Sequence, residues 1–274
     1  MLVETKTLKP EEYRKSLTQY IELYFQPLID KEIYAQLINR EFQIEVATNQ
    51  SKKSLGITTD WQQFRQASSE NFCTEEYMKL LFKDQYKPDR HDDFVFYSKK
   101  IRYLQQLVFT HAKVIQFIDM LPYNGEFIIY LTNYVPVIDR TGEIIAIQAT
   151  SIESYILRFQ GHLRKPNIKV EDKQFKKNFS TRELEILFLL TNGATQEQIA
   201  QILNLARTTI SSIIANQICP KFSIIGANTK MLIDAAINAG FYLDMPKSLW
   251  KPCIIILNED LLEDPQLKEI AEHK

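Results

Sequence analysis

Glycine is scarce in this chain, accounting for only seven of its 274 residues. Nucleotide-dependent enzymes hold phosphates in glycine-rich loops, because the backbone must approach the phosphate closely. No such loop occurs, and neither a G-x-S-x-G nucleophile turn nor an H-E-x-x-H zinc pair is present in the sequence. These absences exclude the enzyme classes that depend on those motifs, and we expect a protein that is not an enzyme.

Cysteine and long apolar runs are also sparse. Cys73, Cys219 and Cys253 have the spacing of neither a disulfide framework nor a metal site, which suits a reducing compartment. The first residues lack the apolar core of a signal peptide, and the run Cys253–Leu257 is too short to span a bilayer. We therefore expect a cytoplasmic protein without a membrane segment, and interpret Cys253–Leu257 as a buried or edge strand that closes onto one of the domains.

A broad basic charge is missing as well. The formal net charge is −1, whereas proteins that bind nucleic acid nonspecifically rely on neutralising phosphates. Basic residues nevertheless concentrate in one segment, namely at Arg158, Arg164, Lys165, Lys169, Lys173, Lys176 and Lys177. Two interpretations stay open for this segment: a solvated linker, or a stretch that flanks DNA and adds salt-dependent affinity.

The segment that follows contains two helix starts of the same kind. Ser180 stands three residues before Glu183, and Thr195 stands three residues before Gln198. In this capping box the hydroxyl accepts from the third helical amide while the longer side chain reaches back. Asn192-Gly193 provides a left-handed stop between the two helices, and Asn204 suits a positive φ after the second. The pattern predicts two short helices joined by tight turns.

A third helix is predicted from about Arg207 to Ile218. Isoleucines share its inner face, namely Ile210, Ile213, Ile214 and Ile218. The opposite face holds Arg207, Thr208, Ser211, Ser212 and Ala215. A helix in the DNA major groove needs short hydrogen-bonding side chains and an arginine that can address guanine or phosphate. The spacing alone fits an ordinary packing unit with a solvated polar face equally well.

The runs T-R-E-x-E-I-L, N-G-A-T-x-x-x-I-A-x-x-L and T-I resemble the LuxR (GerE-type) helix-turn-helix of bacterial transcription regulators, over roughly residues 179–240. The resemblance implies an all-α, four-helix domain that binds double-stranded DNA. Its third helix would read the major groove, and its fourth, near residues 228–239, would form a homodimer contact. The positions that the family uses carry over as phosphate contacts at Thr195, Thr209 and Lys221, and as base contacts at Thr208, Ser211 and Ser212. Arg207 joins this set, whereas Glu183 is expected to act as a structural cap.

The chain departs from the family pattern at several places. Ala206 stands where a capping serine is usual, and Ile213 replaces a frequent histidine. Between Thr209 and Lys221 the chain is one residue longer than the usual pattern, and Pro220 removes a hydrogen bond from any helix that continues through it. The correspondence after Ser212 is therefore not fixed.

The first 155 residues show a different organisation. A helix is expected over about Glu11–Ile29, polar helical material over about 59–106, and turn residues at 39–41 and 139–142. The predicted strands are Ile33–Ile38, Phe42–Ala47, Lys113–Leu121, Phe127–Ile138 and Glu143–Ser151. Strands, a helical middle and a final antiparallel group are the order of an α+β sensor module.

Residues 34–56 resemble the opening of a PAS domain, with Asn49 at a frequent family position, and 135–147 resemble its closing hairpin. An unrelated α+β domain is the alternative. Four aromatic residues are candidates to line a cavity for a small-molecule ligand, but core packing explains them more simply: Trp61, Phe64, Tyr103 and Phe117. The cofactor is unknown. A flavin-reactive cysteine motif is not visible. His91 and His111 are candidate haem ligands, but a lone histidine is far more often an ordinary surface or core residue.

The predicted organisation is a PAS-like sensor domain in 1–157, a basic linker in 158–178, a LuxR-type helix-turn-helix domain in 179–241 and a C-terminal extension in 242–274. The function it indicates is a DNA-binding transcription regulator whose sensor domain controls the helix-turn-helix. The alternative is a non-catalytic sensor or adaptor that acts through protein contacts and has a degenerate helix-turn-helix.

Overall fold

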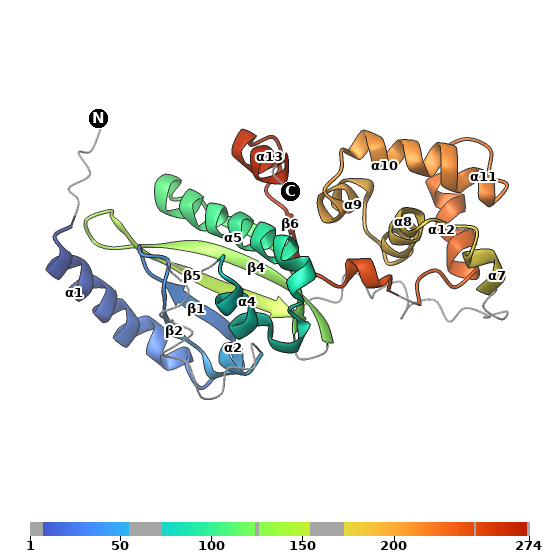
Figure 1. The fold of residues 1–274 in the computed structure, drawn as a ribbon. Helices are drawn as coiled ribbons and strands as arrows, with labels where there is room; N and C mark the ends of the chain where they lie inside the picture. Colours follow the sequence, from blue (N-terminus) through green and yellow to red (C-terminus); the bar gives the residue numbers. More distant parts are fainter. Residues whose placement is uncertain (1–7, 55–72, 124–125, 154–172, 244, 273–274) are drawn as a thin grey trace. The chain divides into compact units, whose positions relative to one another are not determined.

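The computed structural model describes residues 8–54, 73–123, 126–153, 173–243 and 245–272 (Figure 1). The chain divides into two compact units, one formed by Met1–Glu153 with Ile256–Lys274 and the other by Ser154–Ile255. The end of the predicted C-terminal extension thus belongs to the unit that contains the N-terminus. Among the described helices, none combines the length and apolarity that crossing a bilayer requires.

The first unit is built on a sheet with the strand order β2-β1-β5-β4-β3-β6. The strands of this sheet are β1 (Tyr34–Ile38), β2 (Ile44–Ala47), β3 (Ile115–Tyr123), β4 (Glu126–Ile138), β5 (Ile144–Glu153) and β6 (Cys253–Ile256), and the division between the units falls within β6. Antiparallel pairing joins β1 to β2 and β5, and β4 to β3 and β5. All five strands predicted in the N-terminal region are confirmed, and their order is that of the expected PAS-like fold. The buried or edge strand predicted over Cys253–Leu257 is confirmed as β6, the last strand in the order.

Local hydrogen bonds explain the two predicted turns. Between β1 and β2, the amide of Phe42 donates to the carbonyl of Asn39 at 2.9 Å, and Phe42 adopts a positive φ of 60°. Between β4 and β5, Asp139 accepts from the amide of Thr141 at 2.8 Å, and Gly142 takes a φ of 89° that L-residues rarely adopt. The second turn thus uses a glycine for its left-handed residue, whereas the first holds a phenylalanine there and is supported by the Asn39 side chain, which accepts from the Gln43 amide at 2.9 Å.

One face of the sheet is covered by the N-terminal helix α1 (Pro10–Tyr20), which continues through a π-turn η1 (Ile21–Phe25) into η2 (Gln26–Leu28). These segments confirm the helix predicted over Glu11–Ile29. The core on this face contains Tyr13, Leu17, Phe25, Leu37, Val137 and Ile145. The alternation of side chains along each strand leaves the opposite face for a second layer.

The opposite face carries the other helical elements of the first unit (Figure 1). They are α2 (Asn49–Ser54), α4 (Glu75–Phe82), η3 (Lys83–Gln85), η4 (Pro88–Arg90) and α5 (His91–His111). The described part of the predicted helical middle is confirmed by α4 and α5, whereas residues 59–72 of that prediction lie outside the described residues. After β6, the turn η8 (Glu259–Leu261) leads to α13 (Pro265–Glu272), and Asp264 accepts hydrogen bonds from the Tyr103 hydroxyl of α5.

The second unit is helical, as predicted. Its elements are α7 (Lys173–Lys176), α8 (Thr181–Thr191), α9 (Gln196–Leu203), α10 (Arg207–Ile213), η6 (Ile214–Ile218), α11 (Cys219–Lys221), α12 (Thr229–Asn238) and η7 (Lys247–Leu249). Fully buried isoleucine and leucine side chains of α8, α9, α10 and α12 form its core. Four rings pack beside this core at centroid distances of 5.1 to 6.2 Å, those of Phe175, Phe179, Phe222 and Phe241.

Candidate functional site

Both predicted capping boxes are confirmed. The Ser180 hydroxyl accepts from the Glu183 amide at 3.3 Å, and the Glu183 carboxylate accepts from the Ser180 amide at 2.7 Å. Thr195 and Gln198 make the equivalent pair at 3.2 and 2.9 Å. These reciprocal bonds satisfy amides that the helix itself leaves unpaired, so α8 and α9 begin where the sequence places them.

The turn into the third helix follows from Asn204, which takes a left-handed conformation with φ 53°. Helix α10 then begins after Ala206, which supplies no side-chain cap because a methyl group cannot accept a hydrogen bond. Arg207, Thr208 and Thr209 are exposed at this start, and Ile210 is fully buried. The helix therefore presents a polar, solvent-facing edge of short side chains.

The second half of the third helix is a π-turn. The amide of Cys219 donates to the carbonyl of Ile214, five residues earlier, which is the hydrogen bond that defines a π-helix. Ile214 and Ile218, at the two ends of this turn, are both fully buried, and Pro220 lies in the short helix α11 that follows. The predicted helix over 207–218 is confirmed, with a π segment as its second half.

The π-turn adds two exposed side chains, Asn216 and Gln217, that the sequence analysis did not include among the site residues. Asn216 donates to the hydroxyl of Ser212 at 3.1 Å, so the two side chains form one polar patch with the half-buried Ser211. The i, i+4 spacing of Ser212 and Asn216 is visible in the sequence. The correspondence to the family pattern was not fixed after Ser212, so the sequence did not indicate which face of the helix Asn216 would occupy.

Lys221 makes contacts that sequence reasoning missed. Its ammonium group donates to both carboxylate oxygens of Glu183 at 2.7 Å and to the carbonyl of Asn178 at 2.8 Å. Burial disfavours the Glu183 carboxylate, but hydrogen bonds from Lys221 and Ser180 outweigh it and lower the pKa of Glu183. The capping box of α8 and the end of the third helix are thereby joined through one lysine.

Charge near the polar edge of α10 is modest. Arg207 lies 3.9 Å from Glu197, and both side chains are largely exposed, so this ion pair is weak. Of the basic segment before the helices, Lys176 donates to the carbonyl of Gly240 at 3.1 Å within the same unit, and Lys177 is exposed. The positions Arg158, Arg164, Lys165 and Lys169 lie outside the described residues.

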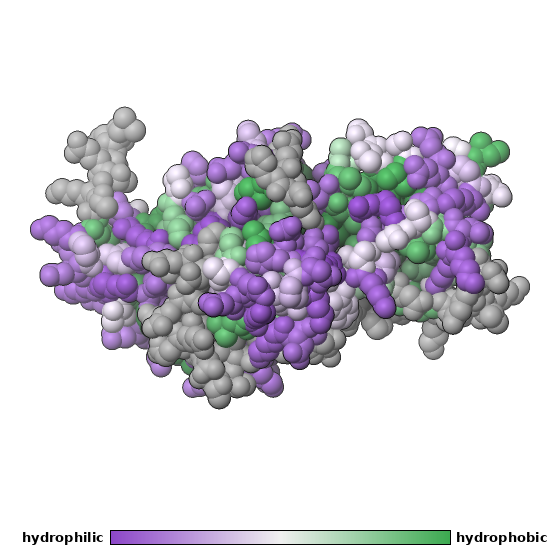
Figure 2. Space-filling view, in the orientation of Figure 1, coloured by the Kyte–Doolittle hydropathy of each residue, from purple (hydrophilic) through white to green (hydrophobic). Residues whose placement is uncertain are grey.

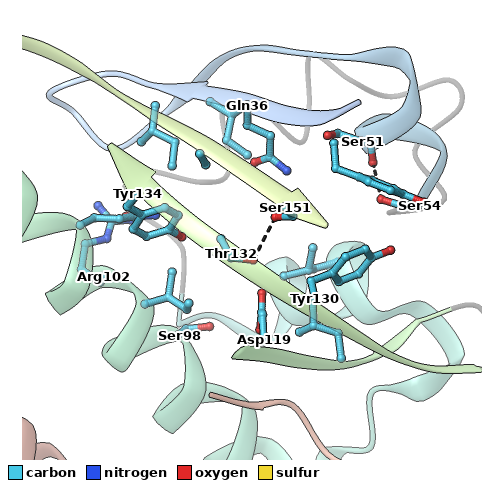
Figure 3. Close-up of a pocket in the computed structure, with 18 of the residues that line it drawn as sticks. Gln36, Ser51, Ser54, Ser98, Arg102, Asp119, Tyr130, Thr132, Tyr134 and Ser151 are labelled. Carbon is cyan, nitrogen blue, oxygen red and sulfur yellow. Dashed lines mark hydrogen bonds between the residues drawn. The ribbon is translucent and has the colours of Figure 1, made fainter. Parts of the chain in front are cut away.

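The first unit contains a cavity of about 160 Å³ between the sheet and the helices α2, α4 and α5 (Figure 3). The strand register builds its floor, because Ser151 of β5 faces Tyr34 of β1 on one side and Thr132 of β4 on the other. The hydroxyls of Thr132 and Ser151 bond to each other at 2.9 Å. The described lining is mixed: more of its area is apolar than polar, and tyrosine, serine and glutamine side chains supply the hydroxyl and amide groups.

Among the described residues that line this cavity, the charged ones are Asp119 on β3 and Arg102 on α5. The Tyr97 hydroxyl lies 3.0 and 3.2 Å from the two oxygens of Asp119, and burial raises the pKa of Asp119 to about 7 in spite of that bond. Burial also lowers the pKa of Arg102. Both shifts have the sign expected for charges removed from water.

The aromatic and histidine candidates of the sequence analysis lie elsewhere. Tyr103 and Phe117 are buried core residues and do not line this cavity, whereas Trp61 and Phe64 lie outside the described residues. His91 bonds to the Tyr86 hydroxyl at 2.9 Å. Within the described part of the chain, no group of three or more histidine, cysteine or acidic side chains is arranged to hold a metal ion.

Comparison with known families identifies one segment. Residues 177–222 match the family described as bacterial regulatory proteins, luxR family. No curated protein matches the chain significantly.

Solved structures with a related arrangement include a phage VqmA–DPO complex, at 17% identity over 89% of this chain and 99% of that one, with a TM-score of 0.48. A Vibrio cholerae VqmA dimer without target DNA gives 17% identity, coverage of 85% and 95%, and a TM-score of 0.43. A Rhodobacter sphaeroides LOV protein gives 12% identity, coverage of 81% and 93%, and a TM-score of 0.31.

Proposed function

We propose that this chain, whose residues 177–222 form a DNA-binding domain of the luxR family of bacterial regulatory proteins, is a cytoplasmic transcription regulator without enzymatic activity. Its PAS-like unit would control DNA binding by the helical unit. The observation that carries the proposal is the family match on α8, α9 and the third helix, whose capped starts and exposed polar edge suit major-groove binding.

In this proposal the third helix lies in the major groove. Thr208, Ser211 and Ser212 would contact base edges, and Arg207 would address guanine or phosphate. Asn216 extends the same surface, because its amide is held against Ser212 and amide side chains can pair with adenine. The exposed hydroxyls of Thr195 and Thr209 would contact the DNA backbone.

Lys221 keeps its proposed phosphate contact, but under a constraint. An ammonium group has three donor hydrogens, and three acceptors surround this one, two on Glu183 and one on Asn178. A phosphate oxygen would therefore compete with Glu183 for the same lysine. We expect Lys221 to add less affinity than an exposed lysine, and to position the third helix as well.

A homodimer would compensate for the small contact surface of one helix. Two copies that bind half-sites about one helical turn of DNA apart double the number of base contacts. Helix α12 is the proposed contact, and its Met231 side chain is exposed at 56%. A small-molecule ligand in the cavity of the first unit would supply the signal.

A salt-controlled DNA titration tests the proposed reading surface. The Arg207→Ala variant should bind its site more weakly by roughly ten- to a hundred-fold and lose discrimination at one base pair. The matched control is Lys15→Ala, which removes an exposed positive charge from α1 and should leave affinity unchanged. Unchanged affinity and specificity in Arg207→Ala would contradict the placement of this helix in the groove.

Genome-wide DNA capture with the full chain provides the target. Enrichment of a palindromic site supports the regulator. Strong recovery of a partner protein without DNA enrichment would instead favour the adaptor, an alternative for which the uncapped Ala206 and the engaged Lys221 are the specific observations.

A further inference from the structure

Ser212 and Asn216 form a hydrogen-bonded pair on the solvent side of the third helix. The amide nitrogen of Asn216 donates to the hydroxyl oxygen of Ser212 at 3.1 Å, and both side chains are exposed. An asparagine amide has two N–H hydrogens and a carbonyl oxygen. Within the described part of the chain no other bond engages this amide, so one hydrogen and the oxygen remain directed to solvent.

The pair belongs to the surface that the proposed function places in the major groove. Thr208, Ser212 and Asn216 follow one another at intervals of four residues, so they form one row along the helix. The surface over α10, along the upper edge of the helical unit, is pale to purple and thus mainly hydrophilic (Figures 1 and 2). Other DNA-reading helices contact bases through side chains spread over about two turns, which is the length of this row.

The remaining hydrogen and oxygen of the Asn216 amide match one base. Adenine presents a donor at N6 beside an acceptor at N7 in the major groove, and an asparagine amide can bond to both at once. Guanine presents two acceptors, thymine an acceptor and a methyl group, and cytosine a donor alone. The amide oxygen would meet another oxygen on guanine or thymine, so those bases turn one contact into a repulsion.

The bond to Ser212 orders the amide before DNA arrives. An exposed side chain loses rotamer freedom when it is immobilised at an interface, and this loss lowers affinity. Asn216 gives up part of that freedom in the unbound protein, because its amide is already bonded to Ser212. Ser212 therefore acts as a positioning residue for Asn216, in addition to any base contact of its own hydroxyl.

We propose that the Ser212–Asn216 pair reads one adenine in the DNA site that the third helix contacts. The proposal rests on the proposed function, because it assigns a base to the same reading surface. Arg207 stands nine residues before Asn216. That separation is about 13 Å along a helix, or about four base-pair steps of DNA. The adenine should therefore lie roughly three to four base pairs from the base that Arg207 addresses.

Selection from a random double-stranded DNA library, with the full chain at one fixed salt concentration, tests the proposal. The unaltered protein should enrich a site with adenine at one position, and Asn216→Ala should lose the preference at that position alone. Asn216→Asp should shift the preference towards cytosine, because a carboxylate accepts from N4 but cannot donate to N7. Gln106→Ala removes an exposed amide from α5 and is the matched control, which should keep the adenine.

Base analogues in the selected site test the same two bonds without altering the protein. Replacement of the adenine by 7-deazaadenine removes N7, and replacement by unsubstituted purine removes the N6 amine. Each should weaken binding of the unaltered protein by roughly three- to thirty-fold. Neither should weaken binding of Asn216→Ala further, because that variant already lacks the partner group.

Two variants test the positioning role of Ser212. Ser212→Ala should reduce the preference for adenine over the other bases, but by less than Asn216→Ala does. Ser212→Thr retains a hydroxyl and should restore most of the preference. A purely structural role for Ser212 would instead lower affinity for every sequence alike and leave the preference at this position unchanged.

Three outcomes overturn the proposal. One is an Asn216→Ala variant that weakens all sequences equally, which would place Asn216 on the phosphate backbone. Another is an unchanged preference in that variant, and the third is dependence on Asn216 at a position where another base is enriched. In each of these the unaltered protein still enriches a site, so the proposed function would stand. Enrichment of no site by the unaltered protein would overturn both.

Discussion

Asp119 is expected to destabilise the sensor unit at neutral pH, and Asp119→Asn to relieve this. Burial raises the pKa of Asp119 from 3.8 to about 7, which means that the folded unit prefers the protonated carboxyl. The protonated Asp119 carboxyl therefore makes its full contribution to the free energy of unfolding below about pH 4. This contribution declines as pH rises towards 7 and is lost above that. One pKa unit corresponds to about 1.36 kcal/mol, so the loss amounts to about 4 kcal/mol at most.

Asparagine cannot ionise, but it is not a perfect replacement. Its amide can still accept from the Tyr97 hydroxyl, while its NH₂ group needs new acceptors and costs about 1–3 kcal/mol if it finds none. We therefore expect Asp119→Asn to raise the free energy of unfolding by about 1–3 kcal/mol at about pH 8. At about pH 4 the variant should be equal to the unaltered protein or less stable.

Urea titration with pulsed hydrogen exchange measures this effect. Peptides from β4 and β5 report the first unit separately, which matters because a chain with two compact units need not unfold in one step. Asp89→Asn, at an exposed carboxyl, is the matched control and should change the free energy of unfolding little at either pH. The reasoning would be refuted if the difference between Asp119→Asn and the unaltered protein were the same at both pH values.

The helical unit yields two further predictions. Lys221→Ala leaves the buried Glu183 carboxylate without its cation and should lower the free energy of unfolding by about 1–3 kcal/mol, less than for a fully buried pair because Lys221 is partly exposed. Because pairing lowers the pKa of Glu183, this loss of stability should shrink as pH falls below about 4. Urea titration with pulsed hydrogen exchange, read from peptides of α8, measures it. A loss that is independent of pH would contradict the pairing. Phe241→Ala removes one ring from the four-phenylalanine cluster and should lower the free energy of unfolding by about 3–5 kcal/mol, whereas Tyr242→Ala, at its half-buried neighbour, should cost less.

The features that the sequence predicted well are those fixed by neighbouring residues. Ser180 and Glu183 are three residues apart, and their reciprocal bonds form within one helical turn. The turn at Asp139 and the left-handed Asn204 likewise depend on the local backbone. Strand alternation and helical periodicity gave the secondary structure of both units for the same reason, since each repeats within a few residues.

The extra residue of the third helix was visible in the sequence, but its structural result was not. An inserted residue can lengthen a loop, end the helix or widen one turn, and the outcome depends on which side chains must stay buried. Here the turn widened into a π-turn, with Ile214 and Ile218 both in the core. The exposed position of Asn216 follows from that choice.

By itself, the sequence determined the elements, the caps and turns, and the family of the helix-turn-helix, because these depend on residues close together in the chain. Only the tertiary structure paired Lys221 with Glu183, which are 38 residues apart, and placed Asp119 and Arg102 around one cavity. It also decided that the last strand joins the sheet beside β3. Burial and the approach of distant groups set the charge and the partners of such side chains, and these quantities do not exist until the chain has folded.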